Sequence, residues 1–210
     1  MSKKFVINIG REFGSGGFKI AEKLSKKMGI NFYDKKLIEL SAQKSGLCKE
    51  YFENSEEKTQ IGLIGDLSGV ASNIFSAGYC SKRYFIDEFL FKIQSDIIRQ
   101  FARKESCIFV GRCADYVLRE HPCAINVFIC ANIDDRVKRI MELRGEADFE
   151  KIKKEIEKTD KNRSKYYDFY TNKVWGAASS YHICINSSIL GLDATACFIH
   201  SFAERRIGKK

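Results

Sequence analysis

The chain has 210 residues, of which 36 are Lys or Arg and 27 are Asp or Glu, giving a formal net charge of +9. This length suits one α/β domain over 1–210 with room for a lid, and it is long enough to bury a sizeable core. The eight cysteines occur singly, with no C-x-x-C pair, which argues against a zinc site. No apolar run approaches the roughly 20 residues of a membrane helix.

The first predicted elements are a strand, a glycine-rich loop and a helix. Residues 5–9 (FVINI) are apolar and β-branched, which predicts a buried strand. The run GREFGSGG at 10–17 follows, and apolar residues then recur at helical spacing until Gly29. Glycines let backbone N–H groups approach an anion, and a helix N-terminus adds its positive dipole end. The segment therefore predicts a phosphate site, with an ordinary turn that binds nothing as the alternative.

This loop departs from the Walker A pattern G-x-x-x-x-G-K-[ST]. Counting from Gly10 puts Gly16 at the lysine position, and the other register puts Gly17 there. Neither register supplies the lysine. Two nearby cations are candidates to replace it, Lys19, which is out of phase, and Arg11, which we prefer because it belongs to the motif.

Residues 7–38, INIGREFGSGGFKIAEKLSKKMGINFYDKKLI, resemble the opening of the cytidylate kinase-like family, a branch of the P-loop nucleoside-monophosphate kinases. Matches downstream extend this resemblance over most of the chain. The resemblance implies a three-layer α/β fold, in which helices flank a parallel sheet of about five strands, with a helical lid. The absence of the Walker lysine is similar to what is typical of that family.

The segment after the first helix is less regular. NFYD at 31–34 predicts a short strand and turn, and a helix over 35–44 follows. Glycines interrupt the pattern over 45–84, which predicts short helices and loops. By resemblance, residues 35–85 hold the acceptor nucleotide. The alternative is a segment that only covers one edge of the sheet.

The remaining strands are separated by helix-sized segments. An apolar stripe predicts a helix over 85–101, and further strands are predicted at 107–110, 125–130 and 182–186. Helical crossovers between strands favour a parallel sheet.

GRCAD at 111–115 follows a predicted strand at its carboxyl end, where open α/β sheets bind ligands. FVGRCADYVL resembles the family signature G-R-x-A-D-Y-x-L. Arg112 matches an arginine that contacts substrate in cytidylate kinases, whereas Cys113 stands where they carry aspartate. Asp115 is a second candidate for acceptor binding. The alternatives are a surface ion pair for Arg112 and a helix N-cap for Asp115.

Two helical segments, 133–144 and about 148–166, meet near Gly145. The apolar face of the first is expected to point inward, with Arg136 and Arg139 projecting mostly elsewhere. In the family, a helix in this place leads into a lid whose arginines close over the phosphates. The resemblance therefore implies a lid over about 132–168 that includes both arginines.

Asp160 and Arg163 match a D-x-x-R sequence that contacts acceptor sugar and phosphate in cytidylate kinases. The same spacing is common for ion pairs on helix surfaces, so a surface pair is the alternative. The aromatic residues of 166–170 are expected to pack the lid on the core. The final helix is predicted to continue to Phe202, with 203–210 as a solvated basic tail.

The resemblance implies transfer of the γ-phosphoryl group of ATP, with Mg²⁺, to a nucleoside monophosphate such as CMP or dCMP. No carboxylate stands out as a dedicated metal ligand, so Mg²⁺ is expected to be held by phosphate and water. The catalytic candidates are Arg11, Arg112 and Arg163. The candidates for the ATP phosphates are Gly10, Arg11, Gly14, Ser15, Gly16, Gly17 and Lys19. The candidates for the acceptor are Arg112, Asp115, Asp160 and Arg163.

Two other functions stay open. The absent lysine and Cys113 permit a non-catalytic sensor or partner module that binds nucleotide or phosphate. Basic charge and aromatic residues permit nucleic-acid binding, which is disfavoured because the charge is spread along helices. No signal peptide opens the chain, so the cytoplasm is the expected location. The sequence leaves open the acceptor, catalytic competence and assembly into a homo-oligomer.

Overall fold

The computed structural model describes residues 4–34, residue 40 and residues 77–208. Their strands form one five-stranded sheet in the order β2-β3-β1-β4-β5, with every pairing parallel. The strands are β1 (Val6–Arg11), β2 (Asn31–Tyr33), β3 (Cys107–Val110), β4 (Ala124–Cys130) and β5 (Ile183–Asn186). The predicted parallel sheet is thus confirmed. Most of the segments predicted over 35–44 and 45–84 lie outside the described residues.

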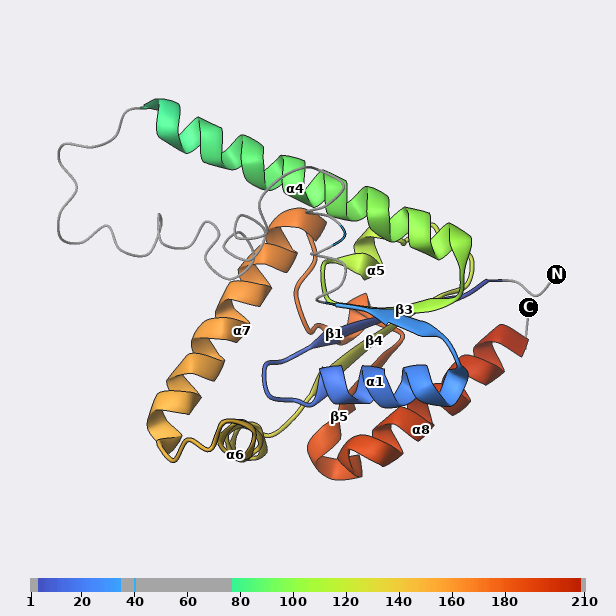
Figure 1. The fold of residues 1–210 in the computed structure, drawn as a ribbon, viewed down its shortest axis with the longest axis vertical. Coiled ribbons are helices and arrows are strands. Elements are labelled where there is room, and N and C mark those ends of the chain that lie inside the picture. The colour runs from blue at the N-terminus through green and yellow to red at the C-terminus, as the bar shows by residue number, and fades with distance from the viewer. Residues whose placement is uncertain (1–3, 35–39, 41–76, 209–210) are drawn as a thin grey trace.

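Helices cover both faces of this sheet, which makes three layers (Figure 1). One face carries α1 (Gly17–Met28) and α8 (Ser187–Gly208), and the other carries α4 (Ala77–Lys104) and α5 (Ala114–Val117). The remaining helices are α6 (Ile133–Arg144), α7 (Phe149–Thr171) and the short 3₁₀ helix η1 (Ala178–Ser180). In Figure 1, α6 and α7 lie beside the end of the sheet where β1 leads into α1.

The core is built from the strands because each is covered on both sides. All four residues of β3 are buried, as a near-continuous apolar run in a parallel sheet should be. Ile20 and Leu24 of α1 pack with Ile199 of α8 in one cluster under the sheet. Ile98 of α4 and Phe109 of β3 belong to the cluster above it. The two clusters hold the strands in place from both sides of the sheet.

The helix boundaries differ from the prediction in two places. Helix α4 begins at Ala77 and not near residue 85, so part of the predicted acceptor segment is helical. Helix α8 runs to Gly208, so the prediction that the final helix ends at Phe202 is wrong, although Glu204, Arg205 and Gly208 of the predicted solvated tail are exposed. Ala203 is fully buried one turn after Ile199, so the core-facing stripe of α8 continues into the basic segment.

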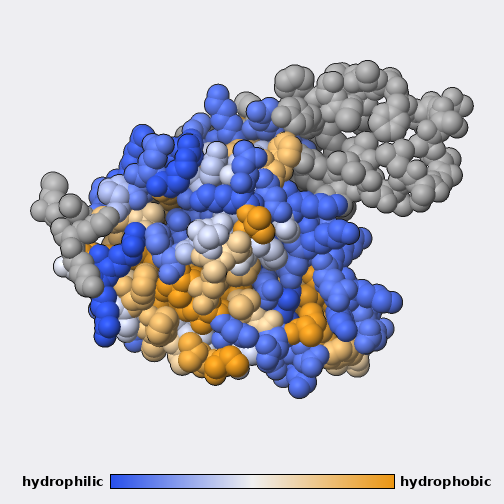
Figure 2. Space-filling view, turned by 180° about the vertical axis from the view of Figure 1, so that it is seen from behind, coloured by the Kyte–Doolittle hydropathy of each residue, from blue (hydrophilic) through white to orange (hydrophobic). Residues whose placement is uncertain are grey.

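From behind, one area in the lower half of the molecule gathers hydrophobic side chains (Figure 2). Among the described residues, no helix combines the length and the apolar character that crossing a bilayer requires.

Candidate active site

The glycine-rich loop joins the carboxyl end of β1 to the amino end of α1. Gly14 and Gly16 have φ values of +78° and +81°, a left-handed conformation that glycine adopts without a steric cost. The Ser15 hydroxyl donates to the carbonyl of Glu12 at 2.8 Å, and the Ser187 hydroxyl donates to the carbonyl of Ser15 at 2.7 Å. The loop is therefore held in a fixed shape at the positive end of a helix dipole, which is where an anion binds well.

The two cations considered as replacements for a Walker lysine lie in different places. Lys19 is more than half exposed and pairs with Glu22 at 3.8 Å along the surface of α1. Arg11 lies with its guanidinium against Gly111, at the end of β3, and its Nη2 is 3.7 Å from Asp34 Oδ1. Arg11 is thus directed toward the neighbouring strand, where the predicted acceptor residues begin.

The turn after β3 has an unusual backbone. Gly111, Arg112 and Cys113 are consecutive residues with φ values of +76°, +60° and +52°. Non-glycine residues in this conformation are uncommon and cluster at functional sites. Burial lowers the pKa of Arg112 to about 10, although the charge of Asp34 opposes that shift. Arg112 is therefore a part-buried cation that interacts electrostatically with Arg11 and Asp34, and its contact with a substrate stays a prediction.

Asp115 lies in the first turn of α5, whose N-cap residue is Cys113, so the N-cap alternative is wrong. Its side chain is buried and accepts a hydrogen bond of 2.6 Å from the Tyr167 hydroxyl. Burial raises the pKa of Asp115, whereas the bond from Tyr167 lowers it in part. This bond joins the turn after β3 to α7, which favours a positioning role. Contact between Asp115 and an acceptor stays a prediction.

The stability of the Asp115→Asn variant relative to the wild type is expected to increase as pH rises from about 4 to 7, because the wild type loses stability over this range. Because the folded-state pKa is raised above that of the unfolded chain, ionisation of Asp115 opposes folding as pH increases through this window. Each pKa unit corresponds to about 1.4 kcal/mol. Urea unfolding at several pH values measures the difference. In Tyr167→Phe the pH dependence should steepen, and a difference between Asp115→Asn and wild type that does not change with pH would contradict this assignment.

A buried ion cluster ties the loop to helices α6 and α7. Arg136 is 6% exposed, so the expectation that it projects away from the core is wrong. Its Nε donates to the Phe13 carbonyl at 2.7 Å, and its Nη1 is 3.3 Å from Glu12 Oε2. Its Nη2 binds Asp160, whose other carboxylate oxygen accepts from the Phe13 N–H at 2.7 Å. Carboxylates from two distant segments explain why this arginine is buried.

Two further arginines contact the loop backbone. Arg163 of α7 donates to the carbonyl of Arg11 at 3.2 Å and lies 5.3 Å from the centroid of the Phe13 ring. Arg139 of α6 donates to the carbonyl of Gly14. The structure thus brings Arg11, Arg136, Arg139 and Arg163 to the loop or its border. Their contacts with ATP or an acceptor stay predictions, as does that of Asp160.

The aromatic segment of α7 packs as expected. Tyr170 stacks on Phe91 of α4 with ring centroids 4.0 Å apart, and Tyr167 is buried. On the other side, Phe128 of β4 meets Trp175 edge to face at 5.1 Å. These contacts fix the end of α7 against the core and support packing over base stacking for this segment.

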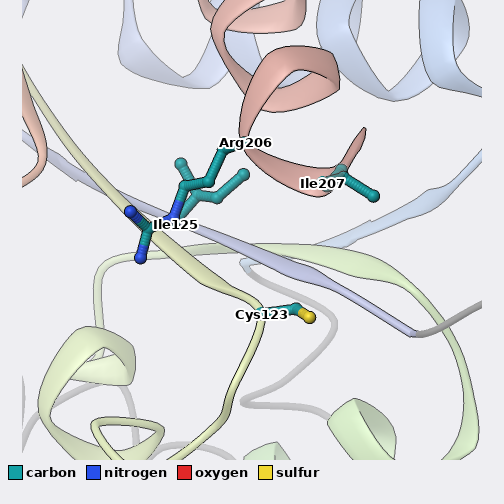
Figure 3. Close-up of a pocket in the computed structure, with 4 residues that line it drawn as sticks. All are labelled: Cys123, Ile125, Arg206 and Ile207. Atoms are coloured by element: carbon teal, nitrogen blue, oxygen red, sulfur yellow. The ribbon is translucent and has the colours of Figure 1, made fainter. Parts of the chain in front are cut away.

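A small pocket lies at the opposite end of the sheet, near the start of β4, and is lined by Cys123, Ile125, Arg206 and Ile207 (Figure 3). Arg206 comes from the last part of α8. The pocket lies at the amino-terminal end of β4, whereas the glycine-rich loop follows the carboxyl end of β1, which runs parallel to β4. The two are therefore at opposite ends of the sheet. The pocket is thus not the site considered above.

Sequence reasoning missed Glu12, Phe13 and Asp34. Glu12 accepts from the Ala131 N–H at 3.0 Å as well as pairing with Arg136, and Phe13 carries the contacts from α6 and α7. Both lie inside the GREFGSGG string, so their position was a usable signal, but their partners lie more than 100 residues away in sequence. Among the described residues, Asp34, Glu12 and Asp160 pair with arginines, and how Mg²⁺ is held stays a prediction.

A five-stranded parallel sheet with a glycine-rich loop after its central strand defines the class of P-loop kinase folds. Solved structures agree. An uncharacterized protein from Eubacterium ventriosum ATCC 27560 is 28% identical with a TM-score of 0.70, covering 96% of this chain and 99% of that one. Shikimate kinase from Bacteroides thetaiotaomicron is 12% identical with a TM-score of 0.53, covering 95% and 98%. Shikimate kinase from Acinetobacter baumannii, solved with shikimate, is 12% identical with a TM-score of 0.52, covering 100% and 96%. At 12% identity these two kinases show the fold alone.

The family model of the cytidylate kinase-like family matches residues 6–189, so the chain belongs to the cytidylate kinase-like family. No curated protein matches the chain at a significant level. Membership of this family supports a nucleotide-dependent kinase.

Proposed function

We propose that the protein transfers the γ-phosphoryl group of ATP to a nucleoside monophosphate, with CMP or dCMP as the first candidates. The observation that carries this proposal is that a glycine-rich loop and a pair of arginines lie at the same edge of the sheet. The glycine-rich loop follows β1, and the Arg11, Arg112 and Asp34 cluster lies at the ends of β1, β3 and β2. A donor and an acceptor phosphate bound there would meet at one edge of the sheet.

The charge of this cluster supports a phosphorylated acceptor. Arg11 pairs with Asp34, and the charges of Arg11 and Asp34 act on the pKa of Arg112 in opposite directions, Arg11 lowering it and Asp34 raising it. At a pKa of about 10, Arg112 stays protonated at neutral pH. A phosphate group at this end of the sheet would meet both guanidinium groups, and arginine pairs well with phosphate oxygens.

To catalyse phosphoryl transfer, a protein has mainly to position the two substrates and to neutralise the charge of their phosphates. The loop over 14–17 holds the ATP phosphates, and Arg112 and Arg163 hold the acceptor phosphate. An acceptor oxygen forms a bond to the γ-phosphorus while the bond from that phosphorus to the bridging oxygen breaks, which releases ADP. Mg²⁺ bound to the ATP phosphates supplies further neutralisation. The protein acts as one domain in the cytoplasm. Its segment 35–85 binds the acceptor, and its segment at about 132–168 serves as the lid.

The second candidate is a non-catalytic nucleotide- or phosphate-binding module. The glycines at the Walker lysine position favour it, as does the area of hydrophobic side chains on one face (Figure 2). Such a module binds ATP but turns over no monophosphate.

A coupled ADP-release assay with Mg²⁺ and ATP separates the two candidates. We expect turnover with CMP or dCMP that exceeds turnover with AMP, GMP and UMP, and little ADP release without an acceptor. ATP binding without turnover on any monophosphate would reject the proposed acceptor class and favour the second candidate.

A further inference from the structure

Helix α7 carries a line of lysines on its outer face. Its inner face is formed by residues that are buried against the core, among them Ile152, Ile156 and Tyr167. At about 3.6 residues per turn, the face opposite to these residues holds four lysines, spaced three or four residues apart. All four are exposed, and we call them the lysine ridge: Lys154, Lys158, Lys161 and Lys165. Helix α7 runs along one side of the molecule (Figure 1).

The acidic residues of α7 do not neutralise the lysine ridge. Asp160 points inward to the ion cluster at the glycine-rich loop, and Glu155 pairs with Arg144 of α6 at 2.8 Å. Glu150 and Glu157 stay exposed and border the ridge. Within the part of the chain that the structure describes, no lysine of the ridge forms an ion pair. The ridge therefore presents four cations against two neighbouring carboxylates, which leaves it positively charged.

The shape of the lysine ridge favours a linear polyanion. Residues 154–165 rise by about 17 Å along the helix axis, with neighbouring lysines about 4.5–6 Å apart. A single row of cations with this spacing can follow the phosphates of one nucleic-acid strand, whereas a membrane presents its charge as a flat surface. Between residues 154 and 165, α7 exposes no apolar side chain that could enter a bilayer. A nucleic-acid strand is therefore a better match than a lipid surface.

An aromatic ring lies at one end of the lysine ridge. Phe169 is one turn beyond Lys165 on the same side of α7, and its side chain is 48% exposed. The neighbouring Tyr167 and Tyr170 are directed to the core and to α4 instead. Proteins that bind single strands combine basic groups for the phosphates with exposed rings on which unpaired bases stack. Phe169 therefore favours a single strand over a duplex, whose bases are paired, and over an acidic protein surface, which has no bases.

We propose that the lysine ridge and Phe169 form a binding surface for single-stranded nucleic acid. The lysines contact phosphates, and the ring stacks on one base, so the strand is held without reading of its sequence. Charge that is spread along the helices in the sequence is thus aligned in space on α7, which removes the reason for disfavouring nucleic acid. This surface goes beyond the proposed function and does not depend on the acceptor of the kinase.

Fluorescence anisotropy with a labelled single-stranded RNA of mixed sequence and about 16 nucleotides tests this surface at several salt concentrations. The logarithm of the binding constant falls by about 0.7 per phosphate contact for each tenfold rise in salt, so four contacts predict a slope of about −3. Combined replacement of Lys154, Lys158 and Lys161 by glutamine should bring the slope to about −1 and weaken binding at low salt at least about tenfold. Phe169→Ala should weaken binding about fivefold or more with the slope unchanged.

The matched control replaces three exposed lysines of α1 and α4 by glutamine, which removes the same charge elsewhere: Lys26, Lys92 and Lys104. This control should keep the slope and affinity of the wild type, and circular dichroism checks that every variant folds. Equal losses in the two triple variants would overturn the proposal, because binding would then follow net charge alone. A wild type that binds no RNA, that binds the duplex of the same sequence as tightly, or that binds only phosphatidylserine vesicles would overturn it too, and the kinase proposal would stand.

Discussion

Replacing Arg136 by alanine is expected to lower the free energy of unfolding by about 3–5 kcal/mol, the range for removing one partner of a buried ion pair. Its side chain is 7% exposed and lies between Glu12 and Asp160. The variant leaves both carboxylates without their cation and removes the donor to the Phe13 carbonyl. Urea unfolding at neutral pH, followed by circular dichroism, measures the change.

Arg144→Ala is the matched control. Arg144 lies on α6, like Arg136, and forms an exposed ion pair with Glu155 of α7, in which Nη1 is 2.8 Å from Oε2. Exposed pairs contribute about 0–1 kcal/mol, so this variant should stay close to the wild type. A loss in Arg136→Ala no larger than that in Arg144→Ala would show that the buried cluster does not hold the loop and α6 together.

Replacing Arg163 by alanine is expected to lower kcat/KM for the monophosphate acceptor about 10³-fold or more, the scale seen when a charge-stabilising arginine is lost in phosphoryl transfer. Arg163 donates to the Arg11 carbonyl next to the glycine-rich loop and lies over the Phe13 ring. The KM for ATP should change little. Steady-state assays that vary each substrate in turn measure both effects.

Lys165→Ala provides the comparison, since Lys165 is an exposed cation on the same helix two residues later. It should keep near wild-type rates. If Arg163→Ala loses less than tenfold, or if both variants lose equally, Arg163 does not act on the acceptor. A fall in the melting temperature of Arg163→Ala alone would reveal a structural contribution and is checked in parallel.

Local patterns predict much of the fold. The apolar run at 5–9 and the glycine after the first helix correspond to β1 and to a C-terminal cap at Gly29 with φ +65°. The break near Gly145 likewise separates α6 from α7. These features depend on neighbours within a few residues, which a sequence displays directly.

The side-chain arrangement of the site could not be predicted in the same way. Arg136 is buried because Glu12 and Asp160 reach it from other segments, and hydrophobic periodicity contains no sign of such partners. Likewise, the direction of Arg11 depends on β1 lying beside β3, an adjacency set by strand order. The predicted end of α8 at Phe202 was wrong because basic residues dominate the sequence after it, although Ala203 among them faces the core.

The most direct test of the central proposal is identification of the products formed from ATP, Mg²⁺ and CMP by ³¹P NMR. We expect ADP and CDP to appear in equal amounts, with no inorganic phosphate in excess of the control without enzyme. ATP that binds but stays intact with CMP, dCMP and every other nucleoside monophosphate would contradict the assignment of a nucleoside-monophosphate kinase.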